Sequence, residues 1–282
     1  MRILITGATG RVGSRFAPRA LQSGHQVRLL VRQPERVERL RQRGAEVIPG
    51  DLSQPEMLAA AVAGVDAIIH LAAFFRGATE EQAQAVNFAG ALALARAAIQ
   101  AGVSRFVFTS TNLVYGPGRG RPARESDEPQ PLMAYPQSKV AAEQALLELH
   151  HSDGLGLRIA RLAFVYGEDD PHLGELPRLV SSWHPAKRLH MAHHADVGHA
   201  LLLLASAPGI DGRIYNVADD APLTIAEIGE HLGLPDWERP DASARPLDDP
   251  WEGVVSNLRL RDELGWRPIY PSFYTARDAG AL

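Results

Sequence analysis

The sequence predicts an α/β protein with a doubly wound parallel sheet, and three observations lead to that fold class. Up to about residue 165, short apolar runs alternate with helical stretches, which is typical of strand–helix–strand crossovers. The runs Val27–Val31 and Ala67–Leu71 are almost continuously apolar, as expected of strands buried on both faces. A glycine-rich turn also follows the first strand-like run, Arg2–Thr6, and precedes a helical stretch.

The elements of this first part follow in order. Strands are expected at Arg2–Thr6, Gln26–Val31, Glu46–Pro49, Ala67–Leu71, Arg105–Ser110 and Leu157–Leu162. Helices are expected near residues 12–23, 34–43, 55–63, 80–101 and 134–152. Residues 116–131 are rich in Gly, Pro, Arg and acids without periodicity, and so long a connection favours a mobile lid over a passive loop.

The regular alternation ends after residue 165. Residues 167–196 show no periodicity, and then a helix (197–206), a strand (Arg213–Val217) and helices at Thr224–Leu232 and 257–264 are expected. We therefore expect two domains, residues 1–165 and a smaller one at 166–282, with some segments of the second returning to the first.

Composition excludes several classes of protein. The 282 residues carry a net charge of −4, which gives no electrostatic reason to expect nucleic acid or an anionic membrane as partner. The absence of cysteine excludes disulfides, thiolate metal sites and cysteine nucleophiles. No apolar run approaches the roughly 18 residues of a membrane span, and a secretory signal is not expected. A cytoplasmic location is expected.

The glycine-rich turn, TGATGRVG, has the features of a dinucleotide-binding site. Glycines at 7, 10 and 13 permit a tight turn and a close approach of the backbone to a pyrophosphate, and the helix that follows presents free N–H groups to the phosphates. The expected nucleotide contacts from this turn are Gly7, Thr9, Gly10, Arg11 and Val12.

The end of the second strand indicates which nucleotide is bound. NAD enzymes of this architecture place a carboxylate there for the ribose 2′-hydroxyl. In this chain Val31 and Arg32 occupy the position, and the first carboxylate is Glu35. Arg32, assisted by Arg11, suits a 2′-phosphate, so NADP is favoured with NAD as the alternative. The competing interpretation is that Arg32 is simply a solvated charge at a helix start.

Further motifs resemble the extended short-chain dehydrogenase/reductases, a family also grouped as NAD-dependent epimerases/dehydratases. The similarity runs along nearly the whole chain. It rests on TGATGRVG, GDLSQPE, HLAA (His70–Ala73), VNFAGALALARAA (Val86–Ala98), FTSTNLVYG (Phe108–Gly116), YPQSK (Tyr135–Lys139), RLAFVYG (Arg161–Gly167) and LGWRPIYPS (Leu264–Ser272). The resemblance implies a Rossmann-type nucleotide-binding domain and a small C-terminal substrate-binding subdomain. It also implies further nucleotide contacts from Asp51, Leu52, Leu71, Ala72 and Ala73.

The pair Tyr135 and Lys139 is the candidate catalytic core. The two residues are four positions apart, so they lie on one face of a helix, where an ammonium favours the phenolate of a tyrosine. By the resemblance, Lys139 also holds the ribose hydroxyls, and Thr111 polarises the reacting oxygen; Ser110 is the second candidate for that role. Asn87 either braces the site or bonds only to backbone. Lysine is scarce, with Lys187 the other one in the chain.

Two departures from the family pattern bear on the substrate. Asn112 and Leu113 stand where the family's dehydratases carry an Asp-Glu pair, so dehydration lacks its acid and base. The C-terminal region is also short, which puts a nucleotide-sugar substrate in doubt. Candidate substrate-pocket residues are Phe75, Leu113 and Tyr166.

Other features complete the prediction. His190, His193, His194 and Asp196 lie close in sequence, but the chemistry requires no metal, and Asp196 is expected to cap a helix. Apolar stripes on the helices at 80–101 and 134–152 suggest a homodimer, since equivalent helices pair in the family. The stripe residues are Leu92, Leu94, Ala98, Leu146 and Leu147.

The sequence as a whole predicts an NADP-preferring oxidoreductase that interconverts a carbonyl and a secondary alcohol on a small molecule. One alternative is an epimerase that keeps NAD bound, against which the missing carboxylate after the second strand counts. The other is a non-catalytic NADP-sensing protein, against which the joint presence of Thr111, Tyr135 and Lys139 counts.

Overall fold

A computed structural model describes residues 1–75, 79–180, 183–232 and 247–282, and the chain forms two compact units. The first unit contains residues 1–114, 131–161 and 198–215, and the second contains residues 115–130, 162–197 and 216–282. The chain thus crosses between the units several times, whereas the sequence suggested a single boundary near residue 165 with some segments returning. Residues 115–130 in particular join the second unit.

The first unit is built on a seven-stranded sheet with the order β10-β6-β5-β4-β1-β2-β3. Its strands are β1 (Arg2–Thr6), β2 (Gln26–Val31), β3 (Glu46–Pro49), β4 (Ala67–His70), β5 (Arg105–Thr111), β6 (Leu157–Leu162) and β10 (Arg213–Val217). β1 pairs in parallel with β2 and β4, β2 with β3, and β4 with β5. The strand order changes direction between β1 and β4, as in a doubly wound fold. The predicted fold class is therefore confirmed.

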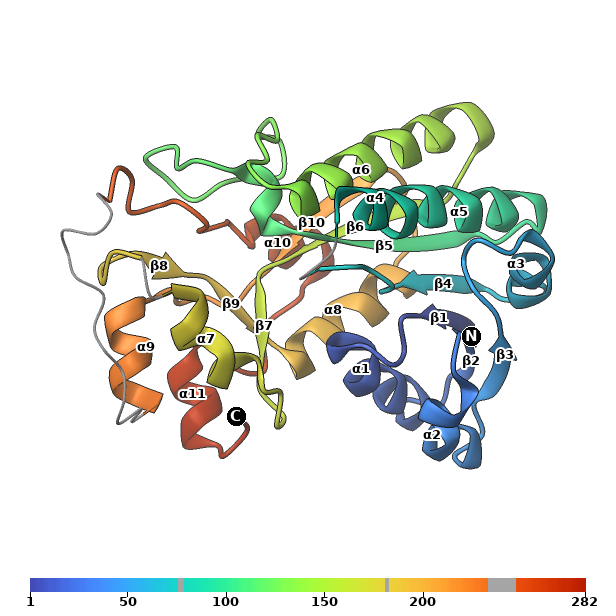
Figure 1. Cartoon of the computed structure of the whole chain (residues 1–282), viewed down its shortest axis with the longest axis horizontal. Helices are drawn as coiled ribbons and strands as arrows, with labels where there is room; N and C mark the ends of the chain where they lie inside the picture. The colour runs from blue at the N-terminus through green and yellow to red at the C-terminus, as the bar shows by residue number, and fades with distance from the viewer. Residues whose placement is uncertain (76–78, 181–182, 233–246) are drawn as a thin grey trace. The chain divides into compact units, whose positions relative to one another are not determined.

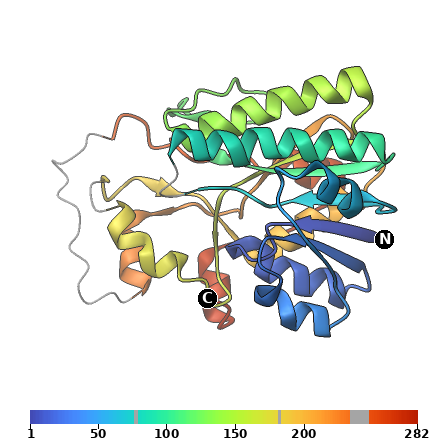
Figure 2. The same cartoon turned by 45° about the vertical axis from the view of Figure 1, so that its right-hand side comes forward.

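Helices cover both faces of this sheet (Figures 1 and 2). They are α1 (Arg11–Gln22), η1 (Pro34–Val37), α2 (Glu38–Gln42), α3 (Pro55–Val62), α4 (Glu80–Ala83), η2 (Gln84–Gly90), α5 (Ala91–Gln100), η3 (Asn112–Tyr115), α6 (Ala134–Asp153) and α8 (His194–Ser206). α3, α5 and α6 form one layer, and α1 and α8 lie on the opposite face. There a Cβ on Gly198 of α8 would stand 3.1 Å from Cδ of Arg19 on α1, so the two helices are in close contact.

The core of the first unit lies between the sheet and the layer of α3, α5 and α6. Leu58 of α3, Leu94 of α5 and Leu146 of α6 are fully buried against Ile68 and Phe106 of the sheet. Each buried apolar side chain of this size contributes about 1.5–3 kcal/mol relative to its exposed state. Leu94, Leu146 and also Ala98 therefore serve the core, so three of the five apolar residues that suggested a dimer face are already accounted for.

The helix predicted at 80–101 is interrupted. It consists of α4, a π-helical segment (η2) and α5, and Asn87 lies in the π-helical segment. Wide turns of this type are frequent at functional sites because they insert an extra residue that redirects a side chain. The sequence pattern could not reveal this, since one inserted residue barely changes an apolar stripe.

Two helices of the second unit, α9 (Ile225–Leu232) and α10 (Leu258–Leu264), coincide with the helices predicted at Thr224–Leu232 and 257–264. The sequence did not predict β7 (Phe164–Tyr166), α7 (His172–Val180), β8 (Arg188–Leu189), β9 (Met191–His193), β11 (Leu223–Thr224) and α11 (Phe273–Asp278). Residues 167–196 were expected to be irregular, and that prediction was wrong. α7 contains Gly174 and Pro177, which lower helix propensity, and strands of two or three residues are too short to show periodicity.

Residues 115–130 are tied to a distant part of the chain within the second unit. Ala123 donates its N–H to the carbonyl of Val254 at 2.9 Å and accepts the N–H of Ser256 at 2.7 Å. The N–H of Gly120 is bonded to Asp249 at 2.6 Å. This loop is thus fixed at several points of its length, whereas a mobile lid was expected. Within the described residues, no helix combines the length and the apolar character that crossing a bilayer requires.

Candidate active site

The glycine turn between β1 and α1 has a backbone that only small residues allow. Gly7 adopts φ +73°, and a Cβ there would stand 2.6 Å from the amide nitrogen of Ala72. A Cβ on Gly13 would stand 2.1 Å from the carbonyl oxygen of Gly7. Gly10 is the N-cap of α1 and supplies no side-chain cap, so the first N–H groups of the helix are left for a ligand. These features fit the pyrophosphate of a dinucleotide.

The other predicted residues of the turn lie around these glycines. Thr9 and Val12 are partly buried, and Arg11 is exposed at the first turn of α1. At the carboxyl end of β4, Leu71 and Ala72 are partly buried and Ala73 is exposed. The structure therefore places the turn next to residues 71–73, because a Cβ on Gly7 would meet the backbone of Ala72.

Arg32 and Asp51 lie at the ends of the neighbouring strands β2 and β3. The Arg32 side chain is 74% exposed, and its Nε is 3.9 Å from Oδ2 of Asp51. A pair so long and so exposed contributes little to stability, and the guanidinium stays available to a ligand. Asp51 accepts hydrogen bonds from the N–H and hydroxyl of Ser53, which lower the pKa of its carboxyl. Leu52 beside it is partly buried.

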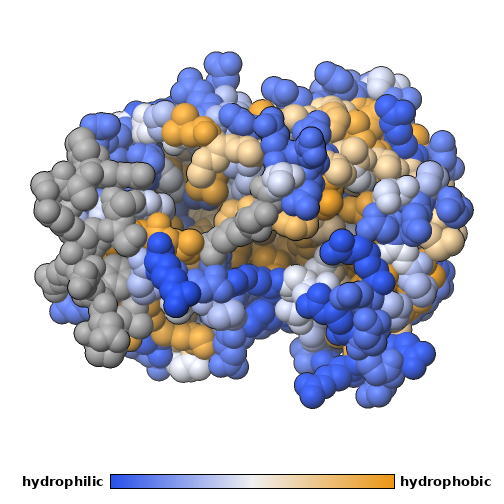
Figure 3. All heavy atoms as spheres, viewed as in Figure 1, coloured by the Kyte–Doolittle hydropathy of each residue, from blue (hydrophilic) through white to orange (hydrophobic). Residues whose placement is uncertain are grey.

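The surface after β2 is strongly charged. Arg32, Glu35, Arg36 and Arg39 are all exposed, and the surface over η1 and α2 is strongly hydrophilic on the face shown in Figure 3. Arg32 is therefore the residue that directly follows β2. The nearby carboxylate, Asp51, follows β3 and not β2.

Lys139 is the most deeply placed charged group of the site. Its side chain is 1% exposed, and Nζ donates a hydrogen bond to the carbonyl oxygen of Thr109 on β5 at 2.8 Å. The ammonium also lies 4.5 Å from the centroid of the Phe108 ring. Burial lowers the pKa of Lys139 to about 7, and the carboxylate of Glu143 opposes that shift. Near neutral pH, the protonation state of Lys139 is therefore sensitive to small changes in the charges near its ammonium.

His70 is a second buried titratable group next to Lys139, and its imidazole had no place in the predicted site. Its Nδ1 is hydrogen-bonded to the hydroxyl of Thr6 at 2.7 Å, and Nε2 has no hydrogen-bond partner among the described residues. Burial, helped by the charge of Lys139, lowers the pKa of His70 to about 3. The imidazole is neutral, and it adds no positive charge beside Lys139.

Tyr135 lies at the first turn of α6, four residues before Lys139. Its ring meets the ring of Phe75 edge-on, with centroids 4.7 Å apart. Burial raises the pKa of the Tyr135 hydroxyl above its ordinary value. The sequence predicted that an adjacent ammonium would favour the phenolate, whereas burial acts on the Tyr135 hydroxyl in the opposite direction.

Thr111 ends β5 and is 7% exposed. Its hydroxyl oxygen accepts the N–H of Leu113 at 3.2 Å, so the hydroxyl proton remains free to be donated. The neighbouring Ser110 is 3% exposed, and its hydroxyl has no hydrogen-bond partner among the described residues. Leu113 is half-buried at the same strand end.

Asn87 joins the segment after β4 to the start of α6. Its side chain exchanges two hydrogen bonds with the backbone of Phe74, at 2.7 and 3.0 Å, and donates a third to the hydroxyl of Ser138 at 3.0 Å. Ser138 in turn donates to the carbonyl of Tyr135 at 2.7 Å. Both interpretations of Asn87 hold in part: it bonds to backbone, and by doing so it fixes the turn of α6 that carries Tyr135.

Tyr166 is buried in the core of the second unit. It is 0% exposed and packs with Leu173 and Phe273, and its hydroxyl has no hydrogen-bond partner among the described residues. Of the three predicted pocket residues, Phe75 is exposed, Leu113 half-buried and Tyr166 enclosed.

The histidine-rich segment forms separate hydrogen bonds. His194 is bonded to Asp170 at 2.7 Å and His193 to the carbonyl of Ala281 at 2.7 Å. Asp196 was expected to cap a helix starting at 197, but α8 starts at His194. The Asp196 carboxylate instead accepts the N–H groups of Ile269 and Tyr270. Among the described residues, no group of three or more potential ligands could hold a metal ion.

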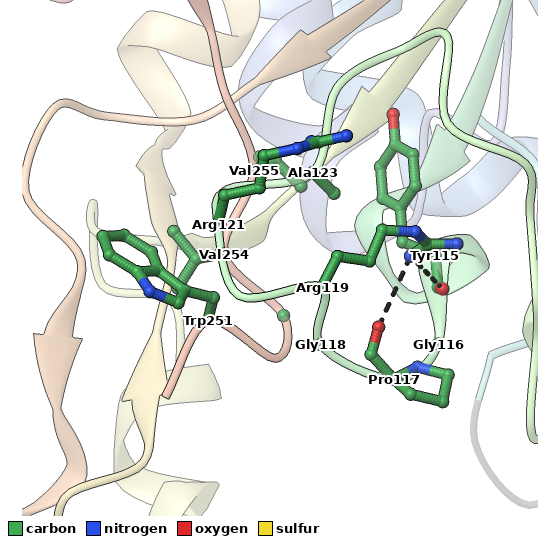
Figure 4. Close-up of a pocket in the computed structure, with 11 residues that line it drawn as sticks. Tyr115, Gly116, Pro117, Gly118, Arg119, Arg121, Ala123, Trp251, Val254 and Val255 are labelled. Atoms are coloured by element: carbon green, nitrogen blue, oxygen red, sulfur yellow. Dashed lines mark hydrogen bonds between the residues drawn. The ribbon is translucent and has the colours of Figure 1, made fainter. Parts of the chain in front are cut away.

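The second unit also has a pocket of its own, between the loop 115–130 and residues 251–255 (Figure 4). Arg119 is placed there by hydrogen bonds to the carbonyls of Tyr115 and Pro117, and it also donates to the backbone carbonyl of Glu128 at 2.6 Å. Trp251, Val254 and Val255 supply an apolar wall. The guanidinium of Arg121 is engaged by both carboxylate oxygens of Asp127.

The doubly wound sheet, the glycine turn and the pair of Tyr135 and the buried Lys139 on α6 are the features of a dinucleotide-dependent enzyme. The model of the NAD dependent epimerase/dehydratase family matches residues 3–218, and the chain belongs to this family. A 4-hydroxy-2-methyl-3-oxo-4-farnesyl-3,4-dihydroquinoline-1-oxide ketoreductase of Stigmatella aurantiaca is 31% identical over 96% of this chain and 82% of its own length. A 3-beta-hydroxysteroid dehydrogenase of Mycolicibacterium neoaurum is 31% identical over 95% and 77%.

Solved structures agree with this assignment. A Streptomyces venezuelae dTDP-glucose 4,6-dehydratase with NAD bound matches with a TM-score of 0.78 and 27% identity, over 99% of this chain and 97% of its own. The UDP-glucose 4-epimerase of Thermus thermophilus in complex with NAD matches with a TM-score of 0.76 and 27% identity, over 95% and 94%. The relatives are oxidoreductases, dehydratases and epimerases, so this chain is an enzyme of the extended short-chain dehydrogenase/reductase type.

Proposed function

We propose that the enzyme is an NADP-preferring oxidoreductase that interconverts a carbonyl and a secondary alcohol on a small molecule. The observation that carries the proposal is the placement of Tyr135 and Lys139 on one face of α6, with Lys139 buried against the carbonyl of Thr109 on β5. The glycine turn lies at the carboxyl edge of the same sheet, where ligands of open α/β folds bind.

Each residue of the site has a distinct task in this proposal. The turn at Gly7–Val12 and residues 71–73 hold the dinucleotide, and Lys139 binds the hydroxyls of its ribose. Thr111 donates a hydrogen bond to the reacting oxygen of the substrate, and Tyr135 transfers a proton to or from that oxygen. A nicotinamide held there would supply or accept the hydride.

Burial of Tyr135 suits the reductive direction. Because desolvation raises the pKa of its hydroxyl, Tyr135 is protonated over the physiological range and can donate its proton to a carbonyl oxygen. In the oxidative direction the phenolate is needed, and a charged Lys139 favours it. A reductase screen over aldehydes and ketones with NADPH tests the proposal, and activity is expected with wild type and not with Tyr135→Phe.

NADP preference rests on Arg32. Its guanidinium is exposed at the end of β2, and its weak pair with Asp51 leaves it able to bind a 2′-phosphate. The relatives of known structure bind NAD, so the preference is a specific property that direct titration of both nucleotides must establish.

An epimerase that retains NAD is the second candidate, and the similarity to the Thermus thermophilus epimerase favours it. Such an enzyme oxidises and re-reduces one carbon without net consumption of nucleotide. Purified enzyme that releases stoichiometric NAD on denaturation, and interconverts epimeric sugars without added nucleotide, would establish this candidate over the reductase.

We also propose that the enzyme is a homodimer through α5 and α6. After the core residues are set aside, Leu92 and Leu147 remain half-buried on these helices. They are the residues that a second copy would cover.

A further inference from the structure

A buried ion pair lies one helical turn beyond Lys139. Glu143 on α6 and Arg161 on β6 are each 2% exposed. Arg161 donates from Nε to Oε1 of Glu143 at 3.1 Å and from its terminal nitrogen to Oε2 at 2.5 Å, so the two side chains meet in a two-pronged contact. The reaction described above does not use either residue.

A buried ion pair is an energetically unfavourable way to fill the interior of a protein. Removing two charges from water costs more than their attraction commonly returns, and apolar side chains of similar volume often stabilise a protein at least as well. Its position suggests another purpose. Glu143 follows Lys139 by four residues, so the carboxylate and the ammonium project from the same face of α6.

We propose that Glu143 is a positioning residue that keeps Lys139 in its charged form, and that Arg161 holds the Glu143 carboxylate in place for this task. The inference rests on the proposed function in one respect, namely that the charge of Lys139 serves the nucleotide ribose and Tyr135. The electrostatic part concerns the free protein alone.

The groups that face Lys139 support this assignment. On β5 it meets the carbonyl of Thr109 and the ring of Phe108, which are uncharged. On β4 it faces His70, whose imidazole is neutral because burial lowers its pKa to about 3. On β6 the positive charge of Arg161 is engaged by Glu143. The Glu143 carboxylate is therefore the charged group that opposes the desolvation of Lys139.

Burial and the Glu143 carboxylate act in opposite directions on the pKa of Lys139, so the loss of Glu143 should change how much of Lys139 is charged. Burial lowers the pKa of Lys139 to about 7, and Glu143 raises it against that effect. With Glu143 removed, the effect that opposes the desolvation of Lys139 is lost, so the pKa of Lys139 is expected to fall further and its charged form to become less populated. A neutral lysine offers the ribose fewer donors and gives Tyr135 no phenolate stabilisation.

The scarcity of lysine makes a direct test practical. The chain has two lysines, Lys139 and Lys187, so protein made with lysine isotope-labelled at the ε-carbon gives two side-chain NMR signals, assigned with Lys187→Arg. In wild type the Lys139 signal is expected to titrate at about pH 7. In Glu143→Gln its midpoint is expected to fall by about one pH unit or more, which corresponds to at least a tenfold loss of the charged form.

Two further variants keep the test decisive. Glu148→Gln is the matched control, because Glu148 is exposed on the same helix, and it should leave the Lys139 midpoint unchanged. Glu143→Gln leaves Arg161 unmatched in the core, so Glu143→Met/Arg161→Met removes both charges at similar volume. The double variant should also lower the midpoint. An unchanged midpoint in the double variant overturns the proposal.

Binding of NADPH to the same proteins separates this inference from the proposed function. Titrations followed by nucleotide fluorescence across pH should show affinity falling as Lys139 loses its proton, at a lower pH in the variants than in wild type. A lowered midpoint together with unchanged NADPH affinity would support the role of Glu143 and contradict the assignment of Lys139 to the ribose.

Discussion

The rings of Phe75 and Tyr135 meet edge-on at a centroid distance of 4.7 Å and an interplanar angle of 62°. This contact depends on the aromatic ring of Tyr135 and not on its hydroxyl, because edge-to-face pairs are held by the ring quadrupoles and by apolar contact. The packing of the residue and its proposed chemistry can therefore be separated by removing a single oxygen atom.

Tyr135→Phe is accordingly expected to abolish turnover and to leave the affinity for NADP(H) nearly unchanged. The lost proton transfer corresponds to roughly 10²–10⁴-fold in rate. Steady-state kinetics with a substrate from the reductase screen, together with calorimetric titration of NADPH, measure the two effects. Tyr274→Phe, the same change in the second unit, is the control and should alter neither. Turnover that survives Tyr135→Phe would mean that another residue transfers the proton.

Thr111→Val tests the hydrogen bond to the reacting oxygen. The variant keeps the shape of the side chain and removes one donor, so turnover should fall by about 10²-fold, less than in Tyr135→Phe. Ser110→Ala is the matched comparison, since the buried hydroxyl of Ser110 is the alternative donor. If Ser110→Ala produces the larger loss, the two neighbouring residues must exchange roles in the mechanism.

Nucleotide choice is expected to depend on Arg32. NADPH should bind more tightly than NADH in wild type, and Arg32→Asp should reverse the order by replacing the partner of the 2′-phosphate with a carboxylate suited to a 2′-hydroxyl. A change of at least about tenfold in the ratio of the two Kd values, or roughly 1.4 kcal/mol, is anticipated. Arg39→Asp, a similarly exposed site on α2, controls for net charge. Equal affinities in wild type would remove the case for NADP.

The sequence predicted the first unit far better than the second, and the reason is physical. β1, β2 and β6 coincide with the predicted strands because strands buried on both faces leave largely apolar runs. The elements missed in the second unit are short or carry breakers, as α7 does with Pro177. Their position depends on contacts distant in sequence, such as Ala123 with Val254 and Ser256.

The candidate site shows the same division between local and distant information. The glycine turn and the spacing of Tyr135 and Lys139 are local patterns, and the structure brings them to one edge of the sheet. Lys139 contacts a carbonyl on β5, and Glu143 contacts Arg161 on β6. The partners in each contact are far apart in the sequence, so no local pattern predicts them. The raised pKa of the Tyr135 hydroxyl is likewise a consequence of burial, which the spacing of residues in the sequence does not reveal.

The proposed dimer can be tested at its two remaining apolar residues. Wild type is expected to be a dimer by light scattering at micromolar concentration, and Leu92→Glu/Leu147→Glu should be monomeric, because each added charge would have to be desolvated at the interface. The control is Leu258→Glu, since Leu258 is 56% exposed on α10. A monomeric wild type would contradict the proposal.

The buried imidazole of His70 should make the stability of the fold depend on pH. Its pKa is lowered from an ordinary value of 6.5 to about 3, so the unfolded chain binds the proton more readily than the native one. The contribution is fully present above about pH 6.5 and is lost as pH falls toward 3, at up to about 1.4 kcal/mol per pH unit. Denaturant titrations of wild type and His70→Asn across this window should show a shallower slope in the variant.

The glycine turn should tolerate no added side-chain atom at Gly13, for steric reasons alone. A Cβ on Gly13 would stand 2.1 Å from the carbonyl oxygen of Gly7, too close for any adjustment short of moving the backbone. Gly13→Ala should therefore lower the free energy of unfolding by about 1–3 kcal/mol and also weaken NADPH binding, because the displaced backbone is the proposed pyrophosphate site.

Gly174→Ala is the matched control, since Gly174 lies in α7 with nothing within 4 Å of a Cβ. A glycine inside a helix costs roughly 0.5–1 kcal/mol relative to alanine, so this variant should be slightly more stable than wild type and bind NADPH equally well. Thermal unfolding and calorimetric titration give both quantities for both variants. A Gly13→Ala enzyme with unchanged NADPH affinity would show that the dinucleotide does not rest on this turn.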